Sequence, residues 1–372
     1  MSPNNEFAEK LGRIENWLAN ENLAGLLLGT QRNFTWLSCG GSNHVGLATP
    51  DGVAFLFVTN DGRRYLLAPN NERPRLFDEE VGQFGFEPIE IPWYELRANP
   101  LRWRQAIGEI VDPDRVGADT NLGGLANVEA KFAPLRYRLT ETEVERYRIH
   151  GRAVAEGVEE TARAVEPEMS EREIEALLAG NLMRRGARPT VLLIAADDRF
   201  FKYRHPIPTD NRVQRYVCLS TCARQWGMIA AVTRLVHFGP ATDEIGRKYA
   251  ALQRVEANLL AATRPGATSG ELFDRLAASY AEEGYDDEWR LHHQGGATGY
   301  IEREWVATPG GGQTVAAPQA FAWNPTIAGT KVEDTIIASE TGIEILTVTG
   351  SWPSVEIEVE GGTLRRPQIL IR

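Results

Sequence analysis

The feature that most constrains the fold of this 372-residue chain is an internal repeat in its second half. A helical stretch, a turn with Pro167, a second helical stretch and Gly186 recur in the same order 98 residues later, with Pro265 and Gly284. Strand-like stretches follow each copy, at 190–195 and 215–237 in the first and at 297–306, 319–323, 332–338 and 343–348 in the second. A duplicated helix-helix-strand unit predicts two halves around a pseudo-twofold axis, with a cleft between them.

The residues before the repeat predict a smaller α/β domain. A first amphipathic helix over residues 5–20 is indicated by apolar residues at helical spacing, namely Phe7, Leu11, Ile14 and Leu18. Apolar runs separated by turn signals predict strands at 24–28, 34–38, 52–58 and 65–67, followed by a helix over 96–110. Thr140 and Glu143 then form a capping-box pair that opens a long helix. We therefore expect an N-terminal domain over 1–134 and a C-terminal domain over 135–372.

Composition excludes several classes of function. The chain carries 51 acidic and 40 basic residues, a net charge of -11, and has no outstanding Lys/Arg run, so nucleic acid is not an expected partner. Its apolar runs are too short for a membrane span, and its first residues do not resemble a signal peptide. Three cysteines argue against a disulfide framework and for a reducing compartment. These features predict a cytoplasmic protein.

The stretch 291–304, LHHQGGATGYIERE, is the strongest candidate for a site. It combines two histidines, three glycines, an arginine and two glutamates without helical spacing of apolar groups. Glycines allow close approach of the backbone, and ionisable groups beside them are typical of a polar pocket. A glycine-rich turn with solvated charges is the alternative.

Five stretches of the chain resemble one known family. They are RHPIPTDNRV at 204–213, the strand ending in Val232-Thr233-Arg234, GGATGYIERE at 295–304, AFAWNPTI at 320–327 and KVEDTIIASETGIEILT at 331–347. The C-terminal part resembles the pita-bread fold of aminopeptidase P, prolidase, methionine aminopeptidase and creatinase. The N-terminal part resembles the companion domain of the creatinase and prolidase branch. The resemblance implies an α/β (α+β) protein with duplicated helix-helix-strand units.

The same resemblance implies the loss of the peptidase metal site. Peptidases of the family hold two metal ions with two Asp, one His and two Glu, since a pair of divalent ions needs several hard anionic ligands. The matching positions in this chain are Ser220, Ala231, Gly296, Asn324 and Glu333. One ligand of the five remains, so the resemblance predicts a protein without a metal cofactor.

Creatinase, which hydrolyses a C–N bond without metal, is the member that this pattern resembles most. His205 stands at the position of its catalytic histidine, and Arg303-Glu304 resembles its Arg-Glu pair. Thr233 replaces a glutamate of creatinase, which argues against creatine as the substrate. The predicted catalytic residues are His205 as general acid and base, with Glu304 and Glu333 holding a cationic group or orienting water. A solvated loop histidine is the alternative for His205.

The predicted substrate-binding residues are Arg234, Arg303, His292, His293, Ser220, Thr233, Asn324 and His44. Arg234 or Arg303 would anchor a carboxylate, although Arg234 is equally suited to pair with Glu333 or Asp334. Residues 292 and 293 cannot both face one side of an extended segment, so one of the two histidines is expected in the pocket. His44 would reach the active site of the other subunit if the chain forms a homodimer, as the resemblance implies.

The leading hypothesis is a metal-independent hydrolase of the creatinase branch that cleaves a C–N bond in a small polar molecule. Two alternatives stay open. One is a metallopeptidase of the Xaa-Pro aminopeptidase or dipeptidase type, and the other is a non-catalytic protein that binds a small molecule or peptide in the inherited cleft.

Overall fold

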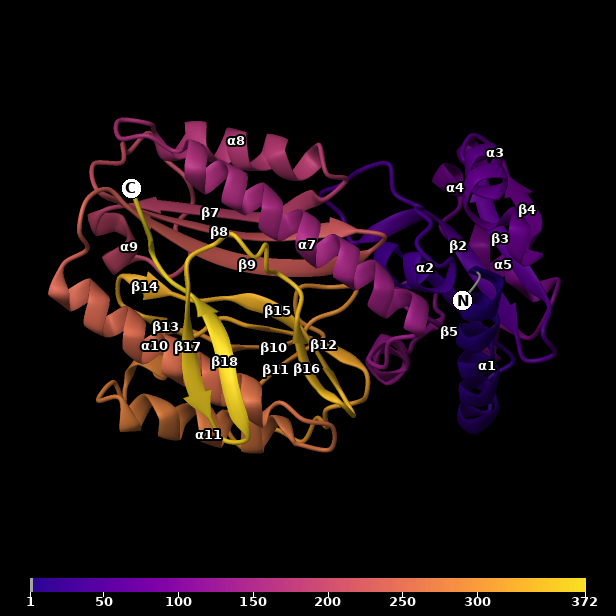
Figure 1. Ribbon diagram of the computed structural model, residues 1–372. Coiled ribbons are helices and arrows are strands. Elements are labelled where there is room, and N and C mark those ends of the chain that lie inside the picture. The colour runs from indigo at the N-terminus through magenta and orange to yellow at the C-terminus, as the bar shows by residue number, and fades with distance from the viewer. Residues whose placement is uncertain (1–2) are drawn as a thin grey trace. The chain divides into compact units, whose positions relative to one another are not determined.

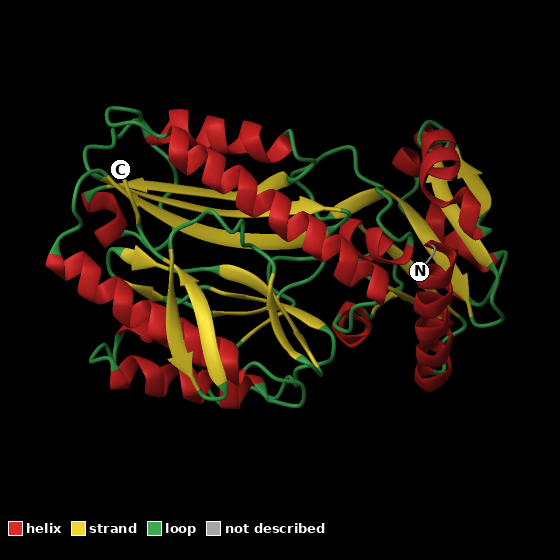
Figure 2. Cartoon of the chain, in the orientation of Figure 1, coloured by secondary structure: helices red, strands yellow, loops and turns green. Residues whose placement is uncertain are grey.

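The computed structural model describes residues 3–372, which divide into two compact units (Figures 1 and 2). Unit 1 comprises Met1–Arg136 and Thr140–Thr142, and unit 2 comprises Tyr137–Leu139 and Glu143–Arg372. Both units combine helices and strands, as expected for an α/β (α+β) chain.

Unit 1 is built on a six-stranded mixed sheet of order β4-β3-β2-β1-β5-β6. Its strands are β1 (Gly25–Thr30), β2 (Asp51–Thr59), β3 (Arg64–Pro69), β4 (Glu87–Ile91), β5 (Val116–Ala118) and β6 (Ala126–Asn127). Its α-helices are α1 (Pro3–Glu21), α2 (Gln31–Leu37), α3 (Arg73–Arg75), α4 (Trp93–Ala98), α5 (Arg102–Gly108) and α6 (Glu129–Phe132). The unit also contains a π-helix, η1 (Leu76–Val81), and the 3₁₀ helices η2 (Gly82–Phe84), η3 (Pro113–Arg115) and η4 (Ala133–Arg136). Every residue of β1 is buried, which explains its unbroken apolar character.

The strand predicted at 34–38 is wrong, because this stretch lies mostly in helix α2. Thr30 caps the helix by accepting a hydrogen bond from the backbone N–H of Asn33. The apolar residues that suggested a strand, Phe34, Trp36 and Leu37, are all fully buried. Periodicity alone does not distinguish a short buried helix from a buried strand. The helix predicted over 96–110 is also divided, into α4 and α5.

Unit 2 contains two larger sheets and two hairpins. The four-stranded sheet, of order β19-β9-β8-β7, uses β7 (Arg188–Ala196), β8 (Tyr216–Gln225), β9 (Met228–His237) and β19 (Leu370–Ile371). The five-stranded sheet, of order β11-β10-β12-β15-β16, uses β10 (Gly295–Ala297), β11 (Trp305–Val306), β12 (Gln319–Trp323), β15 (Asp334–Ser339) and β16 (Gly342–Ile345). The hairpins are β13 (Thr326–Ile327) with β14 (Thr330–Lys331), and β17 (Ser354–Val359) with β18 (Gly362–Pro367). An isolated bridge between Thr233 and Glu333 joins β9 to the start of β15.

The helices of unit 2 carry the repeat. The first pair is α7 (Glu141–Ala164) and α8 (Glu171–Met183), the second pair is α10 (Asp243–Ala262) and α11 (Ser269–Glu282), and the short helices are α9 (Asp198–Lys202) and η5 (Glu288–Leu291). Figure 1 shows the two pairs on opposite sides of the strands. Ser170 and Thr268, 98 residues apart, each form a capping box at the start of the second helix of a pair. Gly186 and Gly284 follow these helices with φ angles of 76° and 79°. The left-handed conformation at both glycines ends each pair in the same way.

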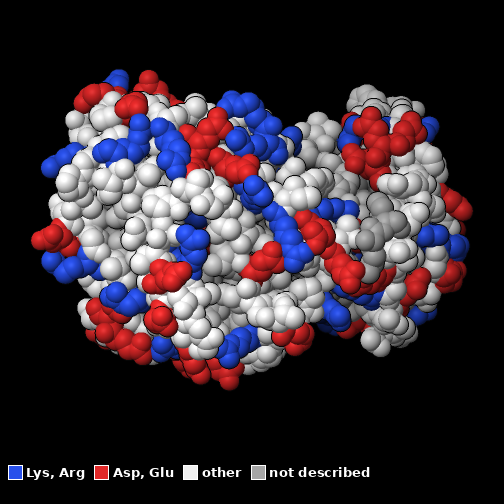
Figure 3. Space-filling model, viewed as in Figure 1, with Lys and Arg blue, Asp and Glu red and all other residues white. Residues whose placement is uncertain are grey.

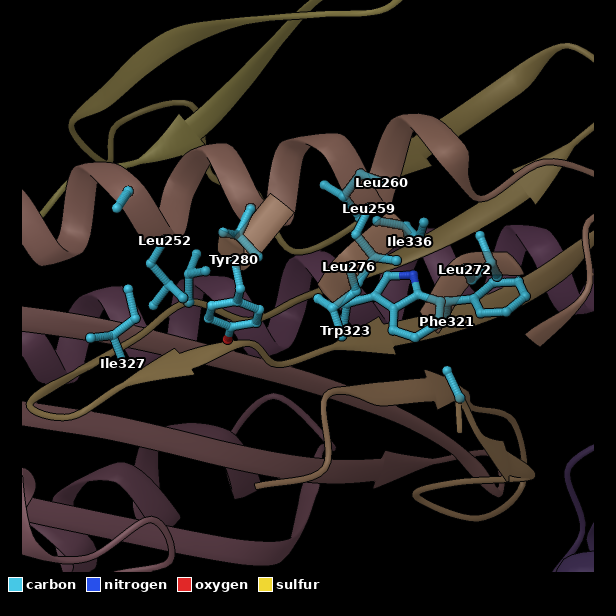
Figure 4. Close-up of a cluster of buried hydrophobic side chains, with 14 of the residues drawn as sticks. Leu252, Leu259, Leu260, Leu272, Leu276, Tyr280, Phe321, Trp323, Ile327 and Ile336 are labelled. Atoms are coloured by element: carbon cyan, nitrogen blue, oxygen red, sulfur yellow. The ribbon is translucent and has the colours of Figure 1, made fainter. Parts of the chain in front are cut away.

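A cluster of buried apolar side chains fixes the second helix pair onto the five-stranded sheet (Figure 4). Phe321 and Trp323 of β12 stack with ring centroids 5.7 Å apart. Leu259 and Leu260 of α10 and Leu276 of α11 close over them. This packing sets the position of β10, β12 and β15, and therefore of the polar residues at their ends.

Acidic and basic side chains intermingle on the face shown in Figure 3. None of the helices among residues 3–372 combines the length and apolar character that crossing a membrane requires.

Candidate functional site

The carboxylate of Glu333 is the centre of the candidate site. Its side chain is 2% exposed. Oε2 accepts hydrogen bonds from Thr233 Oγ1 at 2.9 Å and Ser220 Oγ at 3.4 Å, and it lies 2.9 Å from Lys331 Nζ. The guanidinium of Arg303 contacts Oε1 at 3.2 Å. Burial by itself raises the pKa of Glu333, but the charges of Lys331 and Arg303 outweigh it and bring this pKa below the ordinary value.

The sheets place these groups together. Ser220 of β8 and Thr233 of β9 are cross-strand partners, and their hydroxyl oxygens lie 2.8 Å apart. The bridge between Thr233 and Glu333 then brings the start of β15 beside them. Lys331 lies two residues before Glu333, so an extended backbone directs both side chains to the same face.

Asp334 faces the opposite side, because adjacent residues of a strand alternate. It binds Arg234 at 2.7 Å and Arg366 at 2.5 Å, and Arg366 also contacts Glu256. Arg234, expected as a possible carboxylate anchor, is therefore a structural partner of Asp334. It lines a different cavity from the one that contains Glu333.

A cavity of about 290 Å³ opens above Glu333. Its charged or imidazole lining residues are His205, His293, Glu302, Arg303, Lys331 and Glu333, and its other lining residues are Val191, Leu193, Ser220, Cys222 and Asn324. Predicted residues His205, His293, Arg303, Ser220, Asn324 and Glu333 thus meet in one cavity. Thr233 supports Glu333, although it is not among the lining residues.

His205 and His293 line this cavity, and the ring of His292 lies against both of theirs. His205 Nε2 lies 3.0 Å from His292 Nε2, and the His292 and His293 rings stack with centroids 4.5 Å apart. The His205 and His293 centroids are 5.8 Å apart. Of these two adjacent histidines, His293 is among the residues that line the cavity and His292 is not, in line with the expectation of one pocket histidine.

The histidines share a low proton affinity. Burial, with the nearby charge of Lys331, lowers the pKa of His205. Burial and then Arg303 lower the pKa of His293 to about 4, and the pKa of His292 falls further. All three imidazoles are consequently neutral at neutral pH and offer lone pairs for proton transfer or ligation.

Besides Arg234, two more predicted residues lie apart from this group. Glu304 turns its Oε1 toward the backbone N–H of Tyr300, at 3.2 Å, and is not among the residues that line the cavity. His44 belongs to unit 1, where its Nδ1 lies 2.5 Å from Ser42 Oγ. Its predicted contact with substrate stays a prediction.

Lys331 and Glu302 are the site residues that the sequence interpretation missed. Lys331 is 4% exposed and donates to Ser220 Oγ at 2.9 Å. A signal for Lys331 was present, since it is two residues from Glu333 in an extended motif and must share its face. Glu302 carried no comparable signal.

The residues at the expected two-metal position do not fit a pair of divalent ions. A Cβ on Gly296 would lie 2.1 Å from the backbone oxygen of Trp305, so the strand pairing leaves no room for a histidine there. Ala231 offers no donor side chain, and Ser220 and Asn324 are uncharged. Glu333 supplies the one carboxylate of the five positions, and it is already paired with two cations.

Comparison with known families settles the affiliation of the chain. Residues 145–347 match the model of "Metallopeptidase family M24". The chain belongs to this family. The M24 chain also shares its fold with solved structures: a dipeptidase from Pyrococcus horikoshii (17% identity, TM-score 0.80, 98% of this chain and 100% of the other) and an Xaa-Pro dipeptidase from Bacillus anthracis (18%, 0.76, 98% and 100%). The pita-bread prediction is confirmed.

Curated relatives of this M24 chain carry different names. An uncharacterized peptidase of Staphylococcus epidermidis is 26% identical over 38% of this chain and 43% of its own length, so the match spans less than half of that relative. The Xaa-Pro dipeptidase of Pyrococcus furiosus is 24% identical over 62% and 68%. The agropine synthesis cyclase of Rhizobium rhizogenes is 29% identical over 35% of each chain.

Proposed function

We propose that this M24 chain is a metal-independent hydrolase that cleaves a C–N bond in a small polar molecule, with His205 as general acid and base. The observation that carries the proposal is the position of Lys331. Its ammonium lies 2.9 Å from both Ser220 Oγ and Glu333 Oε2, so the chain places a cation of its own beside the remaining acidic ligand.

Electrostatics favours this arrangement over a pair of metal ions. Two divalent ions bring four positive charges and need several carboxylates to offset them. Here Glu333 already lies beside the positive charges of Lys331 and Arg303. An added dication would be repelled by both, and the displaced cations would lose their partner in a buried place.

The cavity provides groups for hydrolysis without a metal. Neutral His205 takes a proton from water as the water oxygen bonds to the carbon. The C–N bond breaks, and the protonated His205 passes that proton to the departing nitrogen. His205 ends in its starting state, and no reactant other than water is consumed. Arg303, at the cavity wall, is suited to hold an anionic group of the substrate.

Glu333 has a supporting part in this mechanism. Its carboxylate keeps Arg303 and Lys331 in place and offsets their charge. Glu304, turned toward Tyr300, is not used, which revises the catalytic set that the sequence suggested. The relative named as a cyclase supports the idea that the family's fold serves reactions other than peptide hydrolysis.

A second candidate is an Xaa-Pro dipeptidase-type metallopeptidase. The family and the names of several relatives and structural neighbours favour it. It would require two metal ions at a position where Gly296, Ala231 and Lys331 oppose them. The metal requirement therefore distinguishes the two candidates.

The test begins with chelator-treated protein of measured metal content, assayed against small amides, amidines, guanidines and dipeptides. We expect turnover without added metal, and a loss of at least about 100-fold in kcat for His205→Ala, which removes the general acid and base. Ile207→Ala is the matched control, since this side chain lies on the same loop and is 68% exposed.

Two results would contradict the proposal. Turnover that returns only with about two Mn²⁺, Co²⁺ or Zn²⁺ ions per chain would identify a metallopeptidase. Binding of these compounds without turnover under any metal condition would identify a non-catalytic binding protein. Circular dichroism and thermal unfolding of both variants verify that they are folded.

A further inference from the structure

We propose that His205, His292 and His293 form a binding site for one divalent transition-metal ion that prefers nitrogen ligands, such as Zn²⁺. One nitrogen from each ring belongs to a group whose members all lie within 4.8 Å of one another. None of the three is at a ligand position of the family's two-metal site, so this is a different site with different ligand chemistry.

The distances suit coordination after small side-chain rotations. Zn–N bonds of about 2.0–2.1 Å in a tetrahedral site place two ligand nitrogens roughly 3.4 Å apart. The Nε2 atoms of His205 and His292 are 3.0 Å apart, and the remaining separations reach at most 4.8 Å.

Contacts of neighbouring residues restrain the two backbone segments that carry the three rings. Gln294, which is 1% exposed, donates to the backbone oxygen of His292 at 2.5 Å and accepts from Tyr280 Oη at 2.8 Å. Arg204, next to His205, forms an ion pair of 2.5 Å with Glu288 of η5, just before the other two histidines. Both segments that supply ligands are therefore tied to the body of unit 2.

The ligand type selects the ion. Three neutral imidazoles favour Zn²⁺, Cu²⁺ or Ni²⁺ over Mg²⁺ and Ca²⁺, which require oxygen ligands. His292 also has a buried Nδ1 without a hydrogen-bond partner in the described part of the chain. A ligating histidine usually donates from its second nitrogen, and the lack of this support weakens binding by about 10–100-fold. We therefore expect a reversible site rather than a permanently loaded one.

The charges near the site limit its affinity for a dication. Arg204 pairs with Glu288, whereas Arg303 and Lys331 share the one carboxylate of Glu333, so a net positive charge stays near the three histidines and should weaken binding without abolishing it. His205 and His293 also line the cavity, so a fourth coordination position would face its interior. A water molecule or a substrate atom is the expected fourth ligand.

Binding would switch off the hydrolysis proposed above, and this consequence rests on that function. The metal ion takes the lone pair with which His205 accepts a proton. One ion per chain would therefore inhibit turnover, and chelation would restore it.

The site is tested by titrating chelator-treated protein with ZnCl₂ in a calorimeter and with CoCl₂ in a spectrophotometer. We expect one ion per chain and visible cobalt bands of a four-coordinate, nitrogen-rich site. His293→Gln should weaken binding at least tenfold, because it removes one of three ligands. His44→Gln is the control for binding, since His44 is not a member of the three-histidine group.

The outcomes separate this site from the proposed function. Failure of the wild-type protein to bind Zn²⁺, equal binding by His293→Gln, or uptake of two ions that depends on Glu333 would each overturn the three-histidine site. If Zn²⁺ binds with unit stoichiometry and His205-dependent turnover continues at saturation, the site stands and the role of His205 in proton transfer fails. If the ion binds and no substrate is turned over, the site again stands alone.

Discussion

At the scale of single residues, the direction of each side chain decides its role. Glu333 and Asp334 are neighbours in sequence, yet Glu333 joins Lys331 in the cavity and Asp334 binds the buried Arg234 and Arg366. A shift of one residue in the register would exchange the two carboxylates. The buried Arg234–Asp334 pair also shows why charge alone does not identify a binding residue.

Gly296 gives a prediction at this scale. A Cβ at this position would approach the Trp305 backbone oxygen to 2.1 Å and Val306 Cα to 2.9 Å. We expect Gly296→Ala to lower the free energy of unfolding by about 3 kcal/mol or more, since backbone atoms cannot move aside as a flexible side chain can. Gly312→Ala is the control, because nothing lies within 4 Å of its Cβ. Urea denaturation measures both, and equal stabilities would show that β10 has room for a side chain.

At the scale of elements, the second helix of each pair in unit 2 begins with the same capping motif. The capping boxes at Ser170 and Thr268 have matching geometry, with hydroxyl-to-N3 distances of 3.2 Å in both. These caps satisfy backbone N–H groups that the helix leaves without partners. The second helix of each pair thus begins at a defined residue, which fixes the length of the turn before it.

The caps and the exposed helix surface predict opposite changes in stability. Thr268→Ala removes the hydroxyl acceptor at the start of α11 and should cost about 1 kcal/mol. Gly246→Ala in α10 places a methyl group where nothing lies within 4 Å, and it should add about 0.5–1 kcal/mol by restricting the unfolded chain. Thermal unfolding of the two variants beside wild type checks both signs. If Thr268→Ala were as stable as wild type, tertiary packing rather than the cap would determine where this helix begins.

At the scale of the whole molecule, buried titratable groups link stability to pH. His150 of α7 is fully buried, and its Nε2 lies 2.9 Å from the backbone oxygen of Ala223. Burial lowers the pKa of His150 to about 4 from the ordinary 6.5. The unfolded chain therefore binds a proton between these values that the folded chain excludes.

Because the folded protein has the lower pKa for His150, the free energy of unfolding falls as the pH falls. The contribution of His150 to stability is complete above pH 6.5 and is lost as the pH falls toward 4, by about 3 kcal/mol in total. His150→Gln keeps an N–H donor for Ala223 and does not titrate. Its free energy of unfolding should fall less steeply than that of wild type between pH 6.5 and 4.5 in denaturant titrations. Parallel curves would mean that His150 does not titrate as its burial requires.

Much of the fold followed from local patterns. The repeat, its capping residues and its terminal glycines depend on short segments, so the positions of α7, α8, α10 and α11 were predictable from sequence. The family resemblance also assigned Ser220, Ala231, Gly296 and Asn324 to metal-ligand positions, and this assignment stays a prediction. The strand expected at 34–38 failed because burial of an apolar run does not specify its backbone conformation.

The sequence alone determined which ionisable groups the chain possesses and in what order they follow one another. Only the tertiary structure decided which of these groups meet. Lys331 reaches Ser220 across 111 residues of chain, and His205 meets His292 across 87, through sheet pairing that no local pattern encodes. The same packing turned Glu304 and Arg234 toward structural partners. Strand register and long-range burial set the directions of these side chains, and the chemistry open to the cavity depends on those directions.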